Sequence, residues 1–135
     1  MPVERWNGRF QGIGNLGLSG EIPYFYPPPF FSMAAALTSG YATGGSDSGH
    51  TSGLFDAPGW AVGHPEKVID HGHRAVHLMT AASKALVSLF YGSPVRYSYF
   101  TGCSLGGAQG LAEAQRYPLD YDGILSVAPV NYRSH

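Results

Sequence analysis

The chain has 135 residues, of which 44% are hydrophobic and 13% are charged, and its formal net charge at pH 7 is -1. A chain of this length buries about two-thirds of its surface on folding, which is enough for a globular domain. Because there is no basic excess, we expect no nucleic-acid partner. No apolar run approaches the roughly 20 residues that span a bilayer, so we expect no membrane partner either. The first residues also lack the basic and apolar regions of a signal peptide.

The first half of the chain predicts two strands separated by loops and a short helix. Residues Arg9 to Ile13 are predicted to form a strand that ends in a glycine-rich loop. Residues Glu21 to Phe31 are rich in proline and aromatic side chains, which predicts an exposed loop with polyproline stretches. A helix from Ser32 to Thr38, capped by Ser32 and closed by Gly40, leads into a strand at Tyr41 to Thr43.

The second half alternates helices and strands more regularly. Residues Pro65 to Tyr91 carry apolar side chains broadly at helical spacing, and Gly92 ends this helix. A strand at Arg96 to Thr101, a helix at Leu105 to Arg116 and a strand at Gly123 to Val127 follow. This order predicts βαβ units, and hence one α/β domain whose mostly parallel sheet is covered by helices on both faces.

The motif Gly102-x-Ser104-x-Gly106 lies between the predicted strand at Arg96 and the predicted helix at Leu105. A strand, a sharp turn and a helix are the context of the nucleophile elbow in the α/β-hydrolase fold. Such a turn is strained, and side chains at its glycine positions would collide with neighbouring backbone. We therefore predict an α/β-hydrolase fold with Ser104 as the catalytic nucleophile. The alternative is a glycine-rich turn with an incidental serine.

A serine nucleophile needs a histidine base and a carboxylate that orients the histidine, and in this fold both follow the serine in the chain. After Ser104 the sequence offers only Glu113, Asp120, Asp122 and His135. Glu113 is predicted within a helix, the two aspartates at the sheet edge opposite the elbow, and His135 is the last residue. We therefore expect residues 1–135 to be one partial catalytic domain, incomplete at the C-terminus and inactive alone.

An oxyanion hole needs two backbone N–H groups that point at the developing negative charge. The N–H of Leu105 is the first candidate, since it follows the nucleophile at the start of a helix. The second is expected from the glycine-rich loop at Gly12 to Gly17, where Gly14 and Asn15 are the candidates. A purely structural turn is the alternative for this loop.

Three histidines, His71, His73 and His77, lie close together in the longest predicted helix. They could present imidazoles to a metal ion, which makes a metal-binding module one alternative function. However, no glutamate stands between them in a His-Glu-x-x-His arrangement and no cysteine is near. We therefore expect packing or solvent-facing histidines and no metal site.

Other polar and aromatic residues each have two possible roles. Asp47 and His50 follow a predicted strand, at the edge where open α/β sheets bind ligands, and they either contact the substrate or stabilise their own loop. Four aromatic side chains in the proline-rich segment either line an acyl pocket or cover the core; they are Tyr24, Phe25, Tyr26 and Phe30.

Several segments together are similar to the tannase and feruloyl esterase family, and they cover nearly the whole chain in order. These are Trp6 to Asn15, Ser46 to His50, His64 to His77, Tyr99 to Gly107, Glu113 to Pro118 and Tyr121 to Ile124. The Cys-Ser-x-Gly-Gly form of the elbow is more specific than Gly-x-Ser-x-Gly alone. The chain departs from the family pattern at Leu16, where glycine is usual, and in the proline-rich segment.

The resemblance implies a secreted carboxylic ester hydrolase that acts on aromatic esters of the feruloyl or galloyl type. Ser104 would accept the acyl group. Cys103 matches the family cysteine that forms a disulfide with a cysteine beside the catalytic histidine, and that partner is absent from this chain. We expect no cofactor here, although many members bind calcium in a lid domain that this chain lacks. The alternative is a non-catalytic binding protein that keeps the fold without acid and base. The sequence leaves the oligomeric state open.

Overall fold

The computed structural model describes residues 1–26 and 31–131, so Phe30 and His135 lie outside the described residues. Its centre is a four-stranded sheet in the order β2-β1-β3-β4, in which every neighbouring pair is parallel. The strands are β1 (Arg9–Ile13), β2 (Ala42–Gly44), β3 (Tyr97–Cys103) and β4 (Gly123–Val127). The predicted parallel sheet is therefore confirmed, with β2 and β3 shifted by one or two residues.

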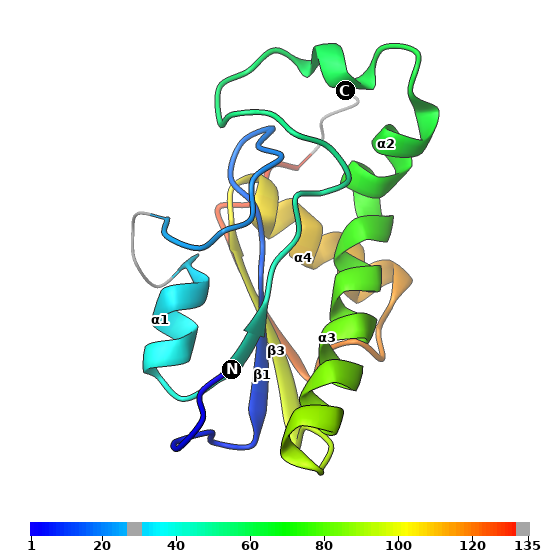
Figure 1. The fold of residues 1–135 in the computed structure, drawn as a ribbon. Coiled ribbons are helices and arrows are strands. Elements are labelled where there is room, and N and C mark those ends of the chain that lie inside the picture. Colours follow the sequence, from blue (N-terminus) through cyan, green and yellow to red (C-terminus); the bar gives the residue numbers. More distant parts are fainter. Residues whose placement is uncertain (27–30, 132–135) are drawn as a thin grey trace.

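Helices cover both faces of the sheet, as the sequence predicted. In Figure 1, α1 (Met33–Thr38) lies on one side of the strands, and α3 (Ala75–Tyr91) and α4 (Leu105–Arg116) lie on the other. The side chain of Ser32 caps α1 by accepting the N–H of Ala35. This bond is the N-terminal cap that the sequence predicted.

The longest predicted helix is continuous but not uniform. It consists of α2 (Pro65–Ile69), a π-helical segment η3 (Asp70–Arg74) and α3. In η3 the N–H of Ala75 donates to the carbonyl of Asp70, five residues earlier. The helix ends at Gly92, whose φ of 67° places it in the left-handed region. The π-helical segment and a short 3-10 helix η2 (Pro58–Ala61) were not predicted.

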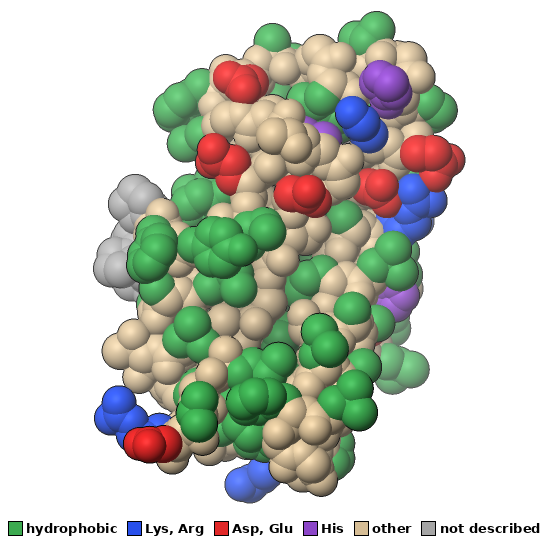
Figure 2. Space-filling model, in the orientation of Figure 1, with side chains coloured by type: hydrophobic (Ala, Val, Ile, Leu, Met, Phe, Trp, Pro, Cys, Tyr) green, Lys and Arg blue, Asp and Glu red, His purple; other side chains and the backbone are tan. Residues whose placement is uncertain are grey.

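The core lies between the sheet and α3. Phe10 of β1 and Phe100 of β3 are each 0% exposed, and they pack with Val76 and Val87 of α3. The outer side of α3 is different, because Leu86 and Leu89 are exposed there. Figure 2 shows apolar side chains at the surface along this helix. Among the described residues, no helix combines the length and the apolar character needed to cross a membrane.

Parallel pairing places the carboxyl ends of all four strands at one edge of the sheet. The glycine-rich loop follows β1, the segment Ser46 to His50 follows β2, and Ser104 follows β3. In open α/β sheets this edge is where ligands bind. The fold thus gathers three of the segments that the sequence singled out.

Candidate active site

Ser104 occupies the sharp turn between β3 and α4. Its φ of 56° and ψ of -116° are rare for a residue with a side chain. Backbone hydrogen bonds hold this turn: the N–H of Ser104 donates to the carbonyl of Val127 over 3.0 Å, and the carbonyl of Ser104 accepts the N–H of Val130 over 3.2 Å. The strained strand-to-helix turn that the motif requires is therefore present.

The glycines of the elbow are needed because backbone segments approach one another closely. A Cβ at Gly102 would lie 2.2 Å from the carbonyl oxygen of Gly106, and a Cβ at Gly106 would lie 2.6 Å from the carbonyl oxygen of Asn15. A Cβ at Gly14 would lie 2.7 Å from the Cα of Gly106. The loop after β1 is thus in direct contact with the first turn of α4, beside Ser104.

The two loop N–H groups that the sequence favoured as oxyanion donors already have partners. The N–H of Gly14 donates to the carbonyl of Thr101 over 3.0 Å, which continues the pairing of β1 with β3. The N–H of Asn15 donates to Oε1 of Gln109 over 2.9 Å. The next N–H along the loop belongs to Leu16, and it has no hydrogen-bond partner among residues 1–26 and 31–131.

A buried polar network fixes this loop on α4, and we call it the Asn15–Ser48–Gln109 network. Gln109 donates through Nε2 to the Oδ1 of Asn15 and to the Oγ of Ser48, both over 3.1 Å, and Ser48 donates to the same Oδ1 over 2.8 Å. Asn15 donates in turn to the carbonyls of Glu21 and Ser46. Asn15, Ser48 and Gln109 are all buried. Each polar group of the network therefore meets a partner, which makes the loop geometry well defined.

Sequence reasoning missed Ser48 and Gln109. A glutamine in a helix usually faces solvent, so its type gave no indication of burial. The neighbouring glycines Gly106 and Gly110 were the available signal, because they lie on the same helix and both face closely packed atoms. Ser48 adopts a φ of 58°, which only the folded structure reveals.

Asp47 and His50 make the contacts of a loop-stabilising pair. His50 is 4% exposed, its Nε2 lies 2.9 Å from the carbonyl oxygen of Leu18, and its ring stacks on Trp60. Asp47 accepts the N–H of Gly49 over 2.9 Å. The contact of His50 with Leu18 ties the segment after β2 to the loop after β1, and that of Asp47 holds the turn within the segment.

The carboxylates that follow Ser104 lie where the sequence placed them. Glu113 is in α4, and Asp122 accepts the N–H of Ser98 over 2.7 Å near the amino end of β3, opposite the elbow. In the described part of the chain, the hydroxyl of Ser104 has no hydrogen bond to a histidine. Cys103 is a free thiol within these residues.

The structure separates His71 from His73 and His77, which both lie against the ring of Tyr117. His71 packs against the rings of His50 and Trp60, and the Nδ1 of His73 lies 2.7 Å from the hydroxyl of Tyr117. The metal-binding module that the sequence suggested on these three residues is therefore not supported by their arrangement.

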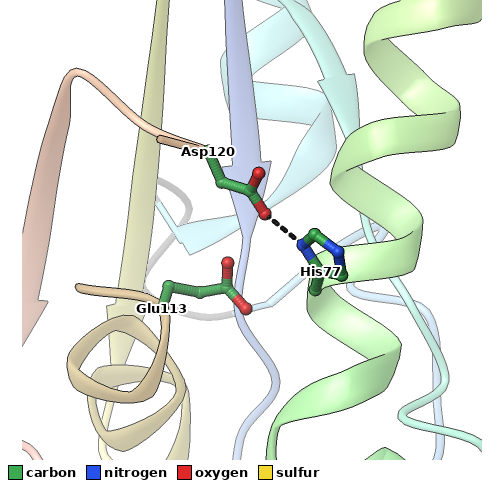
Figure 3. Close-up of side chains that lie close together, drawn as sticks. All are labelled: His77, Glu113 and Asp120. Carbon is green, nitrogen blue, oxygen red and sulfur yellow. Dashed lines mark hydrogen bonds and ion pairs between the residues drawn. The ribbon is translucent and has the colours of Figure 1, made fainter. Parts of the chain in front are cut away.

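His77 instead faces Asp120 and Glu113, as Figure 3 shows. Its Nδ1 lies 2.6 Å from Oδ2 of Asp120. Burial away from water, and next the charge of Asp120, raise the pKa of Glu113 to about 8. Asp120 lies near the amino end of β3, where its carbonyl accepts the hydroxyl of Ser98, so the group is outside the elbow region.

A parallel sheet with helices on both faces and a strained serine between a strand and a helix defines an α/β-hydrolase type of protein. Residues 1–133 match the family described as "Tannase and feruloyl esterase". The chain belongs to this family.

Individual relatives and solved structures agree with the family. The chain is 43% identical over 134 residues to a probable feruloyl esterase B of Aspergillus clavatus, covering 96% of this chain and 24% of that protein. It is 39% identical over 139 residues to a probable feruloyl esterase of Arthroderma benhamiae, covering 98% and 25%. The crystal structure of feruloyl esterase B from Aspergillus oryzae superposes with a TM-score of 0.84 at 35% identity, over 93% of this chain and 24% of that one. The chain thus spans about a quarter of the length of the relatives it matches.

Proposed function

We propose that this chain carries the nucleophile of a carboxylic ester hydrolase that acts on aromatic esters of the feruloyl or galloyl type. The observation that carries the proposal is the conformation of Ser104, with φ of 56° at the turn between β3 and α4. Membership of the tannase and feruloyl esterase family supports the aromatic ester as substrate, since the relatives above are named probable feruloyl esterases.

The proposed reaction begins when Oγ of Ser104 attacks the ester carbonyl carbon and passes its proton to a histidine base. The tetrahedral intermediate then breaks the bond to the alcohol, which leaves with that proton. Water hydrolyses the acyl-enzyme and releases the aromatic acid. The described residues place no histidine at Ser104, so we propose that the base and its carboxylate lie outside residues 1–26 and 31–131.

We propose that two backbone N–H groups bind the oxyanion of the intermediate. The first is that of Leu105, which begins α4, where the helix dipole also favours negative charge. For the second, the sequence favoured Gly14 or Asn15, but their N–H groups bond to Thr101 and Gln109. We therefore propose the N–H of Leu16 as the second donor. The carbonyl of Leu16 accepts the N–H of Ser19, which holds this part of the loop. Each such donor lowers the barrier by roughly 3 to 4 kcal/mol.

Cys103 precedes the nucleophile, and we propose that it forms a disulfide with a cysteine outside this chain, beside the catalytic histidine. Cys103 is the one cysteine of the sequence and is half-buried. Structural disulfides persist in oxidising compartments, so we also propose that the protein is secreted.

Labelling with a fluorophosphonate tests the nucleophile, because the reagent forms a covalent bond to an activated serine. In the intact enzyme, Ser104→Ala should abolish both labelling and turnover of a feruloyl ester, a loss of about 10⁴-fold or more. The control Ser88→Ala, on α3, should keep both. Labelling that persists in Ser104→Ala would exclude this serine as the nucleophile. An intact wild-type protein that neither labels nor turns over esters would favour the non-catalytic alternative.

A further inference from the structure

A second cluster of polar side chains lies away from the elbow and has no role in the proposed reaction. It consists of His77 on α3, Glu113 on α4 and Asp120 in the segment before β4. We propose that these three residues bind a divalent transition-metal ion, for which zinc is the best chemical match. This inference does not depend on the proposed esterase activity.

The geometry brings three ligand atoms into one place. Each residue offers one nitrogen or oxygen atom, and these atoms all lie within 4.8 Å of one another. In Figure 3 the three side chains point toward one another from three separate segments. A single ion there would therefore connect two helices to the strand that follows Asp120.

Glu113 is the independent observation that points to a ligand. It is 0% exposed, and both of its carboxyl oxygens are buried without a hydrogen-bond partner in the described part of the chain. Its nearest acidic neighbour, Asp120, is itself a carboxylate and has no proton to donate while both are ionised. A buried carboxylate without a donor or cation is costly. A metal ion would supply the missing partner.

The other charged and polar groups around the cluster are already engaged. Lys84 donates through Nζ to the main-chain oxygen of Asp120, and its Nζ lies 5.6 Å from the centre of the Tyr121 ring. Among the described residues, no ion pair joins Lys84 to Glu113. The hydroxyl of Tyr121 bonds to Thr80. Metal binding would displace any proton on the two carboxyl groups, and two carboxylates with one ammonium would then carry a net negative charge that a divalent cation offsets.

The ligand set selects among metals. Calcium and magnesium prefer oxygen ligands alone, whereas an imidazole with carboxylates suits zinc at about 2.0 to 2.2 Å per bond. The Nδ1 of His77 and Oδ2 of Asp120 are 2.6 Å apart, so this pair would open by under about 1 Å to admit the ion. The side chains of His77 and Asp120 are 33% and 17% exposed, which leaves a route from solvent.

Zinc titration of the protein after chelator treatment tests the site. The wild type should bind zinc saturably by isothermal titration calorimetry and melt at a higher temperature with zinc than without it. Removing an outer partner of a metal site costs 10- to 100-fold in affinity, so Glu113→Gln, which removes a ligand, should weaken binding by about 100-fold or more. Asp120→Asn should have a similar effect and leaves the buried carboxyl in place.

The matched control is His73→Ala, which removes a histidine four residues before His77 and should leave zinc affinity unchanged. Circular dichroism confirms that each variant is folded. Three results would overturn the proposal: no saturable zinc binding, equal affinity in the wild type and in both ligand variants, or tighter binding of magnesium or calcium. The first would mean that Glu113 keeps a proton and shares it with Asp120.

Discussion

The two buried polar clusters of this protein stand on the same helix and differ in how completely they are satisfied. Gln109 and Glu113 are four residues apart on α4, hence on one side of it, and are 3% and 0% exposed. Gln109 meets the donors and acceptors of Asn15 and Ser48. Glu113 faces a second carboxyl group at Asp120, and neither of its oxygens has a hydrogen-bond partner in residues 1–26 and 31–131. Burying a polar side chain on this face of α4 therefore stabilises the fold where partners are present, as at Gln109, and destabilises it where they are absent, as at Glu113.

Because one cluster is satisfied and the other is not, we infer different roles for the two ends of α4. At its start, a satisfied network holds a backbone loop against Ser104, and a catalytic site needs such a rigid arrangement. Further along, the unsatisfied carboxyl of Glu113 leaves room for a further ligand. Substituting the same residue type at both positions tests this interpretation directly.

The largest effect is expected for Gln109→Leu. Leucine cannot pair with the N–H of Asn15 or with Ser48, and each buried group left unpaired costs about 1 to 3 kcal/mol. We expect the free energy of unfolding to fall by about 2 to 4 kcal/mol, as measured by urea denaturation. In the intact enzyme, the displaced loop should lower kcat by about 100-fold with little change in KM.

Gln115→Leu is the matched control, because Gln115 lies on the exposed side of α4 and should tolerate the change. If the Gln109→Leu variant keeps its kcat and is still labelled at Ser104, then Gln109 does not position the loop for catalysis. The assignment of Ser104 as the nucleophile would not be affected.

A smaller effect of opposite sign is expected for Glu113→Leu. With a chelator present, replacing a buried carboxyl that lacks a donor by an apolar side chain should leave the free energy of unfolding unchanged or raise it by up to about 2 kcal/mol. The measurement is again urea denaturation, side by side with Gln109→Leu. A loss as large as that of Gln109→Leu would show that Glu113 has a strong partner in solution, and the contrast between the clusters would disappear.

The smallest effect concerns pH. Burial, and then the charges of Arg116 and Arg74, hold the pKa of His73 below 6.5, and its Nδ1 contacts Tyr117. The unfolded chain therefore binds a proton more readily than the folded one, so this contribution to stability is complete above pH 6.5 and is lost as the pH falls below it. Melting temperatures at pH 7.5 and 5.5 should differ less in His73→Gln than in the wild type. An equal difference in both proteins would exclude His73 as a source of acid sensitivity.

Much of the fold could be predicted from the sequence because its signals are local. Helical spacing in α3, the cap at Ser32 and the stop at Gly92 act over a few residues, and the structure confirms all three. The alternation of strands and helices also predicted the parallel sheet. The elbow belongs to the same class only in part: Gly102 is required by the backbone of Gly106 within the turn, whereas Gly106 is required by Gly14 and Asn15 in the loop after β1.

The candidate site was predicted only in part. The elbow geometry of Ser104 follows from its own motif, whereas its role as nucleophile stays a prediction. The choice of Gly14 and Asn15 as donors did not take account of Thr101 and Gln109, which engage their N–H groups from distant segments. A hydrogen bond between residues 94 positions apart, such as that of Asn15 with Gln109, has no signature in local pattern.

The sequence by itself therefore determined most of the helices and strands and the need for glycine at Gly102, because each depends on backbone conformation over a short span. Their alternation along the chain indicated a parallel sheet. Only the tertiary structure decided which polar side chains are buried together. It joined Gln109 to the loop after β1 and placed Glu113 beside His77 and Asp120, the latter two being 43 positions apart. The physical reason is that side-chain partners depend on how each helix is rotated and packed against the sheet, which spacing along one segment does not specify.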